Sequence, residues 1–409
     1  MPSPDVIIEK AQGLLPKMIE IRRYLHMHPE LGGQEYETSR HIAETLEDLD
    51  IETKRQVGGT GVVGLLRGKR PGETVALRAD MDALPIQDKK DVIYRSRHPG
   101  VMHACGHDGH VAMLLGAATL LSRCRDELDG NVKFIFQPAE EGPGGAALMV
   151  REGVMDNPRV SAIFGMHIWP DLPLGKVGLK SGPAFAATDE IFIKVIGQGG
   201  HGAAPHRAID AIVVASNIVL ALQALVSRET DPMDPVVLTV GTISGGYKPN
   251  VIADEVTMGA TLRTLSSRVR ADILRRIERT AHGIAKGLGA TCEVTVKNGY
   301  PVAVNSPDMT DFAEEAASKV VGEENIVHEE HPSMGSEDFG YYLQRARGCF
   351  LMLGAGTPGK PVVPAHSPKF DFDERAMAIG CAIFAQLAFS FCVSERWISP
   401  DARGGLFRV

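Results

Sequence analysis

The chain opens with a helical pattern of apolar residues. Between residues 5 and 28 apolar side chains recur at helical spacing, and the pattern stops at Pro29, which cannot continue a helix. A second stretch with helical spacing covers 38–49, and short apolar runs at 58–66 and 74–77 are typical of strands. The N-terminal region therefore predicts two helices followed by strands.

Side chains able to bind metals or carry protons follow four of the predicted strands. These strands lie at 74–77, 132–137, 162–166 and 349–353, and the side chains at or beyond their ends are Asp80, Glu140, Glu141, His167 and His366. The strands lack alternation and are separated by helical stretches, which predicts an α/β domain whose mostly parallel sheet is covered by helices on both faces. Because sites in such sheets lie beyond the carboxyl ends of the strands, we expect these side chains at one crevice.

The middle of the chain has a different pattern. Between residues 187 and 300 the expected order is strand, helix, strand, strand, helix and strand. This βαββαβ order predicts a separate ferredoxin-like domain inserted into the larger one. We therefore expect the larger domain at 1–186 and 301–409, with the inserted domain at 187–300. The tail at 400–409 contains Gly and Arg and is expected to be loose.

Composition excludes several classes of protein. The 409 residues suggest two or three domains at roughly 150 residues each. A net charge of −8 with 23% charged residues leaves no basic footprint for nucleic acid or a membrane surface. No secretory signal is recognisable, and no apolar stretch approaches the roughly 20 residues of a membrane span, so we expect a cytoplasmic protein. Six cysteines without CxxC pairs fit reduced thiols.

The segment His103-Ala-Cys105-Gly-His107-Asp108-Gly-His110 concentrates three imidazoles, a thiol and a carboxylate immediately before an apolar run. These are ligands for borderline-soft divalent cations, and the two glycines let the backbone turn tightly. A solvated His-rich loop before a helix is the alternative. The side chains expected at the strand ends favour a metal site.

A pair of divalent ions needs only five protein ligands if one of them bridges. We expect the thiolate of Cys105 to bridge, with the terminal ligands being His107, Glu141, His167 and His366. Each ion would then have three protein contacts and keep open positions for water and substrate. Two divalent ions carry four positive charges, and the ligands Cys105 and Glu141 carry two negative charges. The remaining positive charge would favour an acidic substrate. The expected cofactors are two ions of Zn, Mn, Co or Ni.

Glu140 needs a separate explanation because it stands beside a ligand carboxylate. A second carboxylate next to a ligand costs repulsion unless it holds a proton or has a positive neighbour. A general base meets this condition, because it takes the proton from an attacking water and passes it to the leaving nitrogen. A solvated acidic pair in a turn is the alternative. The flanking Pro138 and the glycines from Gly142 onward indicate a rigid loop at a strand end, which favours the base.

The chain resembles the M20 metallopeptidase family, in particular its branch of hippurate hydrolases, N-acyl-amino-acid amidohydrolases and auxin-conjugate amidohydrolases. The resemblance covers nearly the whole length. It is carried by HMHPELGGQE (26–35), RADMDALP (78–85), HACGHDGH (103–110), QPAEEGPGGA (137–146), GMHIWP (165–170), GGHGAAPH (199–206), MGSEDF (334–339) and AHSPKFDFDE (365–374).

The resemblance implies a catalytic domain with two metals and a lid and dimerisation domain at 187–300. It implies that His201 reaches across a homodimer or higher oligomer to stabilise the oxyanion, and that Asn250 and Arg263 hold a substrate carboxylate. His201 could instead be structural, and Arg263 a surface ion pair. One departure is Arg78 in place of the wider family's first His ligand, with Asp80 expected to orient a metal-binding imidazole.

The expected function is hydrolysis of the amide bond of N-acyl-L-amino acids, such as hippurate-like or N-acetyl substrates, by metal-activated water with Glu140 as general base. The alternative enzyme is a dipeptidase or aminopeptidase, which needs an anionic pocket for a free ammonium that Glu337 and Asp338 could supply. A non-catalytic metal-binding protein would not need Glu140. We expect a small-molecule substrate and no nucleic-acid or membrane partner.

Overall fold

The protein, seen here as a computed structural model that describes residues 2–142 and 144–393, folds into two compact units. Unit 1 comprises Met1–Gly182, Val304–His331 and Tyr341–Val409 so far as these are described, and unit 2 comprises Pro183–Ala303 and Pro332–Gly340. The boundaries expected from the sequence differ at 183–186, 301–303 and 332–340, which belong to unit 2. The tail at 400–409 lies outside the described residues.

The segment 332–340 joins unit 2 through backbone hydrogen bonds. The N–H of Ser333 donates to the carbonyl of Ala184 at 2.9 Å, and the N–H of Ala186 donates to Gly335 at 2.8 Å. These bonds link stretches about 150 residues apart in the chain. Hydrophobic periodicity does not report such a contact, so it could not be predicted from the sequence pattern.

Unit 1 is built on an eight-stranded sheet in the order β1-β2-β4-β3-β5-β16-β6-β15. The four central strands β4, β3, β5 and β16 run parallel. The strands are β1 (Glu52–Val57), β2 (Gly61–Arg67), β3 (Arg70–Asp80), β4 (Asp129–Gln137), β5 (Ala162–Pro173), β6 (Val177–Leu179), β15 (Ile326–His328) and β16 (Arg347–Gly356). The helices are α1 (Pro4–Met27), α2 (Tyr36–Asp48), α3 (His107–Arg123), α4 (Gly145–Arg151), α7 (Pro307–Val321), α8 (Gly340–Leu343) and α9 (Ala376–Val393).

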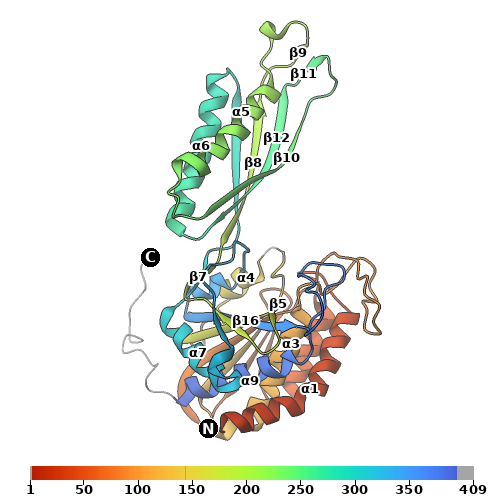
Figure 1. Cartoon of the computed structure of the whole chain (residues 1–409), viewed down its shortest axis with the longest axis vertical. Coiled ribbons are helices and arrows are strands. Elements are labelled where there is room, and N and C mark those ends of the chain that lie inside the picture. The colour runs from red at the N-terminus through yellow and green to blue at the C-terminus, as the bar shows by residue number, and fades with distance from the viewer. Residues whose placement is uncertain (1, 143, 394–409) are drawn as a thin grey trace. The chain divides into compact units, whose positions relative to one another are not determined.

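Helices α1, α3 and α9 pack against one another, and α3 and α9 also pack on the central strands (Figure 1). Almost every residue of α3 is buried, which explains why apolar residues occupy so much of its circumference. The buried side chains of these helices and of the central strands form one continuous core. This core fixes the strand ends from which the polar side chains project.

The register of the strands aligns the polar residues at their carboxyl ends. Asp80 pairs with Gln137 at the carboxyl ends of β3 and β4, and His167 of β5 pairs with Met352 of β16. Glu140 and Glu141 follow β4 directly. The parallel sheet therefore brings these segments to one edge, as the strand ends in the sequence predicted.

Unit 2 has a four-stranded antiparallel sheet in the order β10-β12-β8-β13, with two long helices. The main elements follow the order β8 (Ala187–Ile196), α5 (Ala211–Ala224), β10 (Val236–Gly245), β12 (Glu255–Thr264), α6 (Ser267–Gly287) and β13 (Thr291–Asn298). The short strands β9 (Gly200–His201) and β11 (Val251–Ile252) pair separately, and β7 (Gly182–Phe185) and β14 (Ala303–Asn305) lie where the chain passes between units. The predicted fold class, an α/β domain with an inserted ferredoxin-like βαββαβ domain, is confirmed.

Helix α5 corrects one expectation. Its helical path continues through a π-helical turn at Leu225–Glu229, so Ala211–Glu229 is long and apolar enough to cross a membrane by length and composition. We expected no such stretch from the sequence. One face of α5 is buried on the sheet of unit 2, as expected of a core helix. A single helix of this kind is weak evidence for a membrane span.

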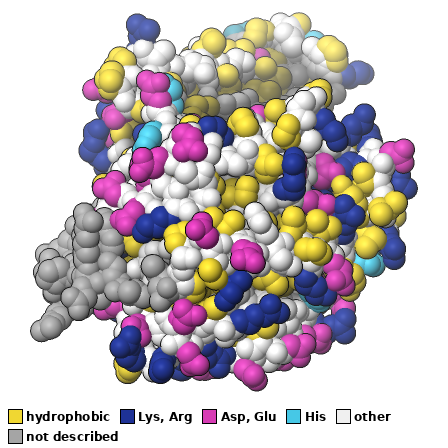
Figure 2. Space-filling view, turned by 60° about the horizontal axis from the view of Figure 1, so that its bottom comes forward, with side chains coloured by type: hydrophobic (Ala, Val, Ile, Leu, Met, Phe, Trp, Pro, Cys, Tyr) yellow, Lys and Arg dark blue, Asp and Glu magenta, His cyan; other side chains and the backbone are white. Residues whose placement is uncertain are grey.

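Acidic and basic side chains are interspersed on the face shown in Figure 2.

Candidate metal centre

The Cys105 loop is shaped by glycine and held by a second loop. Gly106 precedes α3 with φ of 94°, a left-handed conformation that favours glycine. The turn places Cys105 in the loop and His107 at the first position of α3. The backbone N–H of His366 donates to the carbonyl of Ala104 at 2.7 Å, which ties the loop after β16 to this turn. Segments more than 200 residues apart thereby meet at one point.

The structure brings all five predicted metal ligands and Glu140 together within unit 1. In three groups of residues, the potential ligand atoms lie within 4.8 Å of one another. The groups are Cys105 with His107 and His167, Cys105 with Glu141 and His366, and His107 with Glu140 and Glu141. The thiol of Cys105 is common to two groups, with Sγ 3.3 Å from Nε2 of His167. Nε2 of His366 lies 2.9 Å from Oε1 of Glu141.

Two of the imidazoles are oriented by backbone carbonyls. Nδ1 of His107 donates to the carbonyl of Asp82 at 3.0 Å, and Nδ1 of His167 donates to the carbonyl of Ile168 at 2.7 Å. Because a carbonyl can only accept, each ring carries its proton on Nδ1 when it is neutral. The lone pair on Nε2 is then available to a metal ion.

This donor set fits divalent ions. Nε2 of His107 is buried and has no hydrogen-bond partner among the described residues. A buried ring nitrogen without a partner is costly, and coordination to a cation would remove that cost. One thiol, one carboxylate and imidazole nitrogens are the ligands expected for zinc and similar transition metals.

Burial and neighbouring charges shift the pKa values at this centre. Burial lowers the pKa of His167 to about 3, helped by the charge of His110. Hydrogen bonds with Cys105 and Glu141 raise the pKa of His366 to about 10. Burial raises the pKa of the Cys105 thiol above its usual value. The centre without metal therefore holds protons that a bound cation would have to displace.

Asp80 contacts a different imidazole from the predicted ligands. Its Oδ1 accepts a hydrogen bond from Nδ1 of His110 at 2.6 Å and lies 3.8 Å from Nε2 of His107. Nε2 of His110 accepts from the backbone N–H of Ile168 at 2.8 Å, so both of its ring nitrogens are engaged. Asp80 thus orients His110, which accepts from the N–H of Ile168; the carbonyl of the same residue accepts from His167.

Asp82 is a residue of the site that the sequence analysis missed. Its Oδ1 lies 3.2 Å from Nδ1 of His107, and its Oδ2 accepts a hydrogen bond from the backbone N–H of Glu141 at 3.0 Å. Asp82 is therefore the carboxylate beside Nδ1 of His107, while Asp80 lies near Nε2 of the same ring. The available signal was its spacing of two residues from Asp80, which places both side chains on the same side of an extended chain.

In unit 2, His201 and Asn250 lie together on exposed backbone. His201 of β9 pairs with Val251 of β11, and the N–H of Gly202 donates to the carbonyl of Asn250 at 2.9 Å. Nδ1 of His201 accepts a hydrogen bond from the N–H of Ala203 at 3.0 Å, so its Nε2 carries the proton. We call this exposed β9–β11 segment the tip of unit 2 (Figure 1). It presents an imidazole N–H donor to solvent.

Arg263 lies away from the tip. It is the ninth residue of β12 (Glu255–Thr264), whereas Asn250 precedes the first residue of that strand by five positions. At about 3.3 Å per residue, the length of strand between Glu255 and Arg263 is roughly 26 Å. Arg263 therefore lies far along β12 from the end that follows Asn250, and the expectation that both hold a substrate carboxylate stays a prediction. Burial lowers the pKa of Arg263 from its usual value, although Asp189 opposes this.

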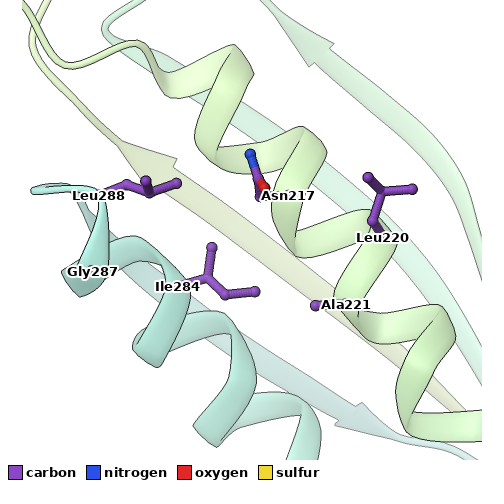
Figure 3. A pocket seen from close by; sticks show the side chains of 6 residues that line it. All are labelled: Asn217, Leu220, Ala221, Ile284, Gly287 and Leu288. Carbon is purple, nitrogen blue, oxygen red and sulfur yellow. The ribbon is translucent and has the colours of Figure 1, made fainter. Parts of the chain in front are cut away.

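A hollow on unit 2 lies between α5 and α6 (Figure 3). Its lining residues are Asn217, Leu220, Ala221, Ile284, Gly287 and Leu288. None of these side chains titrates or can act as a nucleophile. The hollow is therefore no candidate for the catalytic site.

Comparisons with known proteins agree with the geometry. Residues 76–390 match the family described as Peptidase family M20/M25/M40. A thermostable carboxypeptidase 2 of Saccharolobus solfataricus is 44% identical over 91% of this chain and 95% of its own. The IAA-amino acid hydrolase ILR1-like 4 of Arabidopsis thaliana is 42% identical over 95% and 88%. The N-acetyl-L-cysteine deacetylase of Bacillus subtilis is 40% identical over 88% and 85%.

A solved structure is similar over almost the whole chain. The YXEP protein of Bacillus subtilis, described as a dinuclear metal-binding peptidase from the M20 family, has 37% identity and a TM-score of 0.82. The alignment covers 93% of this chain and 99% of that protein. These findings confirm the resemblance and the expectation of a hydrolase. The chain belongs to peptidase family M20/M25/M40.

Proposed function

We propose that this protein is a dimetal amidohydrolase that cleaves the amide bond of N-acyl-L-amino acids. The observation that carries the proposal is the position of Cys105 Sγ, which belongs to two separate groups of potential ligands. A thiolate at that position can contact two ions at once. In this proposal His107 and His167 lie on one side of Cys105, with Glu141 and His366 on the other.

The chemistry divides between the ions and the chain. Two bound divalent ions would polarise the scissile carbonyl and lower the pKa of the attacking water. Glu140 takes the proton from that water and delivers it to the leaving nitrogen. Glu140 is 7% exposed and lies near Glu141 and His107, which supports a role inside the centre rather than in a solvated turn.

Substrate recognition requires a free carboxylate and a second copy of the chain. Arg263 suits the α-carboxylate because its planar guanidinium pairs with both oxygens. Since Asn250 and His201 lie at the tip, far along the sheet from Arg263, we propose that they reach the centre of a partner chain in a homodimer. His201 then donates to the oxyanion through Nε2.

The relatives support this class of substrate. A deacetylase of N-acetyl-L-cysteine, a hydrolase of IAA-amino acids and a carboxypeptidase all act, by their names, beside an amino acid with a free carboxylate.

The aminopeptidase and dipeptidase alternative needs an anionic pocket for an ammonium group. Glu337 and Asp338 are both buried in unit 2, and the backbone N–H of Phe339 donates to Glu337 at 3.0 Å.

A substrate panel tests the proposal. Protein stripped with a chelator and reloaded with Zn, Mn, Co or Ni is assayed on N-acetyl and N-benzoyl amino acids, on the matching amides, and on dipeptides with a free ammonium. We expect metal-dependent hydrolysis of the N-acyl amino acids. Faster turnover of the dipeptides would favour the peptidase alternative, and activity that chelation leaves unchanged would contradict a dimetal mechanism.

A further inference from the structure

The segment that carries Glu140 is held at both ends by buried carboxylates. Oε1 of Glu35 accepts a hydrogen bond from the backbone N–H of Ala139 at 2.9 Å, and Oδ2 of Asp82 accepts one from the N–H of Glu141 at 3.0 Å. Glu35 is 0% and Asp82 is 2% exposed. Glu140 therefore sits between two peptide N–H groups that are each fixed by a buried anion.

The backbone of this segment needs such support. Ala139 has φ of 51°, in the left-handed region that residues with a Cβ rarely adopt. Its carbonyl accepts hydrogen bonds from the N–H groups of Gly144 and Gly145 at 3.2 and 3.1 Å. Both sides of this residue are thus engaged, and an unfavourable conformation persists because its surroundings fix it.

The sequence motif HPELGGQE brings Glu35 to this position. Glu35 is the residue before α2, and its Oε2 accepts a hydrogen bond from the hydroxyl of Thr60 at 2.6 Å. Gly32 of the same motif lies against the segment: a Cβ there would be 3.1 Å from Cα of Ala139 and 3.4 Å from Oδ2 of Asp82. The motif therefore packs on the Glu140 segment without containing a predicted metal ligand.

We propose that Glu35 and Asp82 are positioning residues that form a clamp around Glu140, holding Ala139 in its left-handed conformation so that Glu140 and Glu141 face the centre together. The inference rests on the proposed function in taking Glu140 as the base. Asp82 has a second positioning role: its Oδ1 lies beside Nδ1 of His107, so that Asp82 links the loop after β4 to α3. Neither residue is proposed to touch substrate or metal.

The partners of the two carboxylates predict different responses to amide substitution. In Glu35→Gln the amide oxygen can still accept from Ala139, and the amide nitrogen can donate to the Thr60 hydroxyl, which can reverse its role. In Asp82→Asn the amide nitrogen must face an N–H donor, either of His107 or of Glu141. Glu35→Gln is therefore expected to keep kcat within about threefold of the wild type, while Glu35→Ala and Asp82→Asn lose about 10²-fold because the base is misplaced.

The experiment compares Glu35→Ala, Glu35→Gln, Asp82→Asn and the matched control Thr60→Val, each saturated with metal, on N-acetyl and N-benzoyl amino acids. Thr60→Val removes the hydrogen bond that the Thr60 hydroxyl donates to Glu35 and leaves the bond to Ala139. We expect kcat to fall in Glu35→Ala with KM nearly unchanged, and to stay near wild type in Thr60→Val. Equal losses in Glu35→Ala and Thr60→Val, in proportion to their thermal stability, would reduce Glu35 to a structural role and overturn the inference.

Hydrogen exchange gives a readout that does not depend on activity. In metal-free Glu35→Ala, amides of the peptide spanning residues 138–145 should exchange at least about tenfold faster, while amides of β4 keep their wild-type rates. Unchanged exchange would overturn the clamp. The variant Glu140→Gln separates the clamp from the proposed base. If Glu140→Gln retains turnover, Glu140 is not the base, and hydrogen exchange alone decides whether the clamp exists. If Glu140→Gln is inactive while Glu35→Ala is fully active, the clamp is wrong and the proposed function stands.

Discussion

The metal centre of unit 1 and the tip of unit 2 carry complementary parts of the proposed chemistry, yet one chain builds them to different degrees. At the centre, Cys105, His107 and His167 are buried, and hydrogen bonds to the carbonyls of Asp82 and Ile168 fix the two imidazoles; His366 is exposed. At the tip, His201 of β9 and Asn250, the residue before β11, are exposed. The difference teaches that the fold of one chain preorganises the ligands, whereas the oxyanion donor proposed at the tip would need a partner chain to bring it to a centre.

The largest expected effect falls on the base. Glu140→Gln is nearly isosteric and removes the proton acceptor, so kcat should fall by about 10²–10⁴-fold while both metals stay bound. Steady-state kinetics and metal analysis of the same sample check this. Retained turnover would remove Glu140 as the base, and loss of metal would make it a ligand instead.

The next effect concerns Arg263, which lies far along β12 from the tip. An N-acyl amino acid should be hydrolysed far better than its amide, because a neutral end leaves the guanidinium unpaired. Losing one partner of such a pair costs about 2–5 kcal/mol, which corresponds to a preference of about 30-fold to several thousand-fold. The ratio of kcat/KM for acid and amide should collapse in Arg263→Ala. An enzyme equally fast on both substrates would contradict this role.

Mixing variants tests whether the tip serves a partner chain. His201→Ala alone should lower kcat by about 10²–10³-fold, the effect of removing one oxyanion donor. Mixed with inactive Glu140→Gln, it should regain activity, because one site of each heterodimer would combine an intact base with the partner's intact histidine. If subunit exchange is verified by native mass spectrometry and no activity returns, His201 does not act across the dimer.

The smallest effect is proton release when metal binds. The pKa of His366 is raised to about 10 by its hydrogen bonds with Cys105 and Glu141, so the ring is protonated at pH 8 without metal. A histidine must lose this proton to bind a metal, and the Cys105 thiol, whose pKa is raised, must lose its own, so binding at pH 8 should release about two protons; with an ordinary histidine only the thiol proton would be released. Calorimetric titration in two buffers of different ionisation enthalpy measures this. Release of one proton or fewer would contradict the protonated state of His366.

Much of the fold followed from pattern alone. The helices and buried strands of unit 1 and the βαββαβ order of unit 2 matched their apolar periodicity, because burial dictates side-chain type. β1 (Glu52–Val57) was missed because five of its six residues are exposed or half-buried. The assignment of 332–340 to unit 2 was missed because it depends on backbone hydrogen bonds across a long stretch of sequence.

The site was predictable where chemistry demands rare residues close together. The spacing in HACGHDGH and the strand-end residues Glu141, His167 and His366 identified a cluster that the structure brings together. Roles that depend on which atoms meet were not predictable. Asp82 lies beside Nδ1 of His107 in addition to Asp80 near its Nε2, and Glu35 reaches Ala139 from a distant motif. Hydrogen bonding to backbone leaves no periodic signal in sequence.

The central claim is that two ions share the Cys105 thiolate and act together in amide hydrolysis. Stepwise titration of the metal-free protein, with hydrolysis of an N-acetyl or N-benzoyl amino acid followed at each addition, tests it most directly. We predict that activity rises until two equivalents per chain are bound and then stays constant, and that Cys105→Ala needs far higher metal concentrations. Full activity at one equivalent, or two ions bound by Cys105→Ala with unchanged affinity, would contradict the claim.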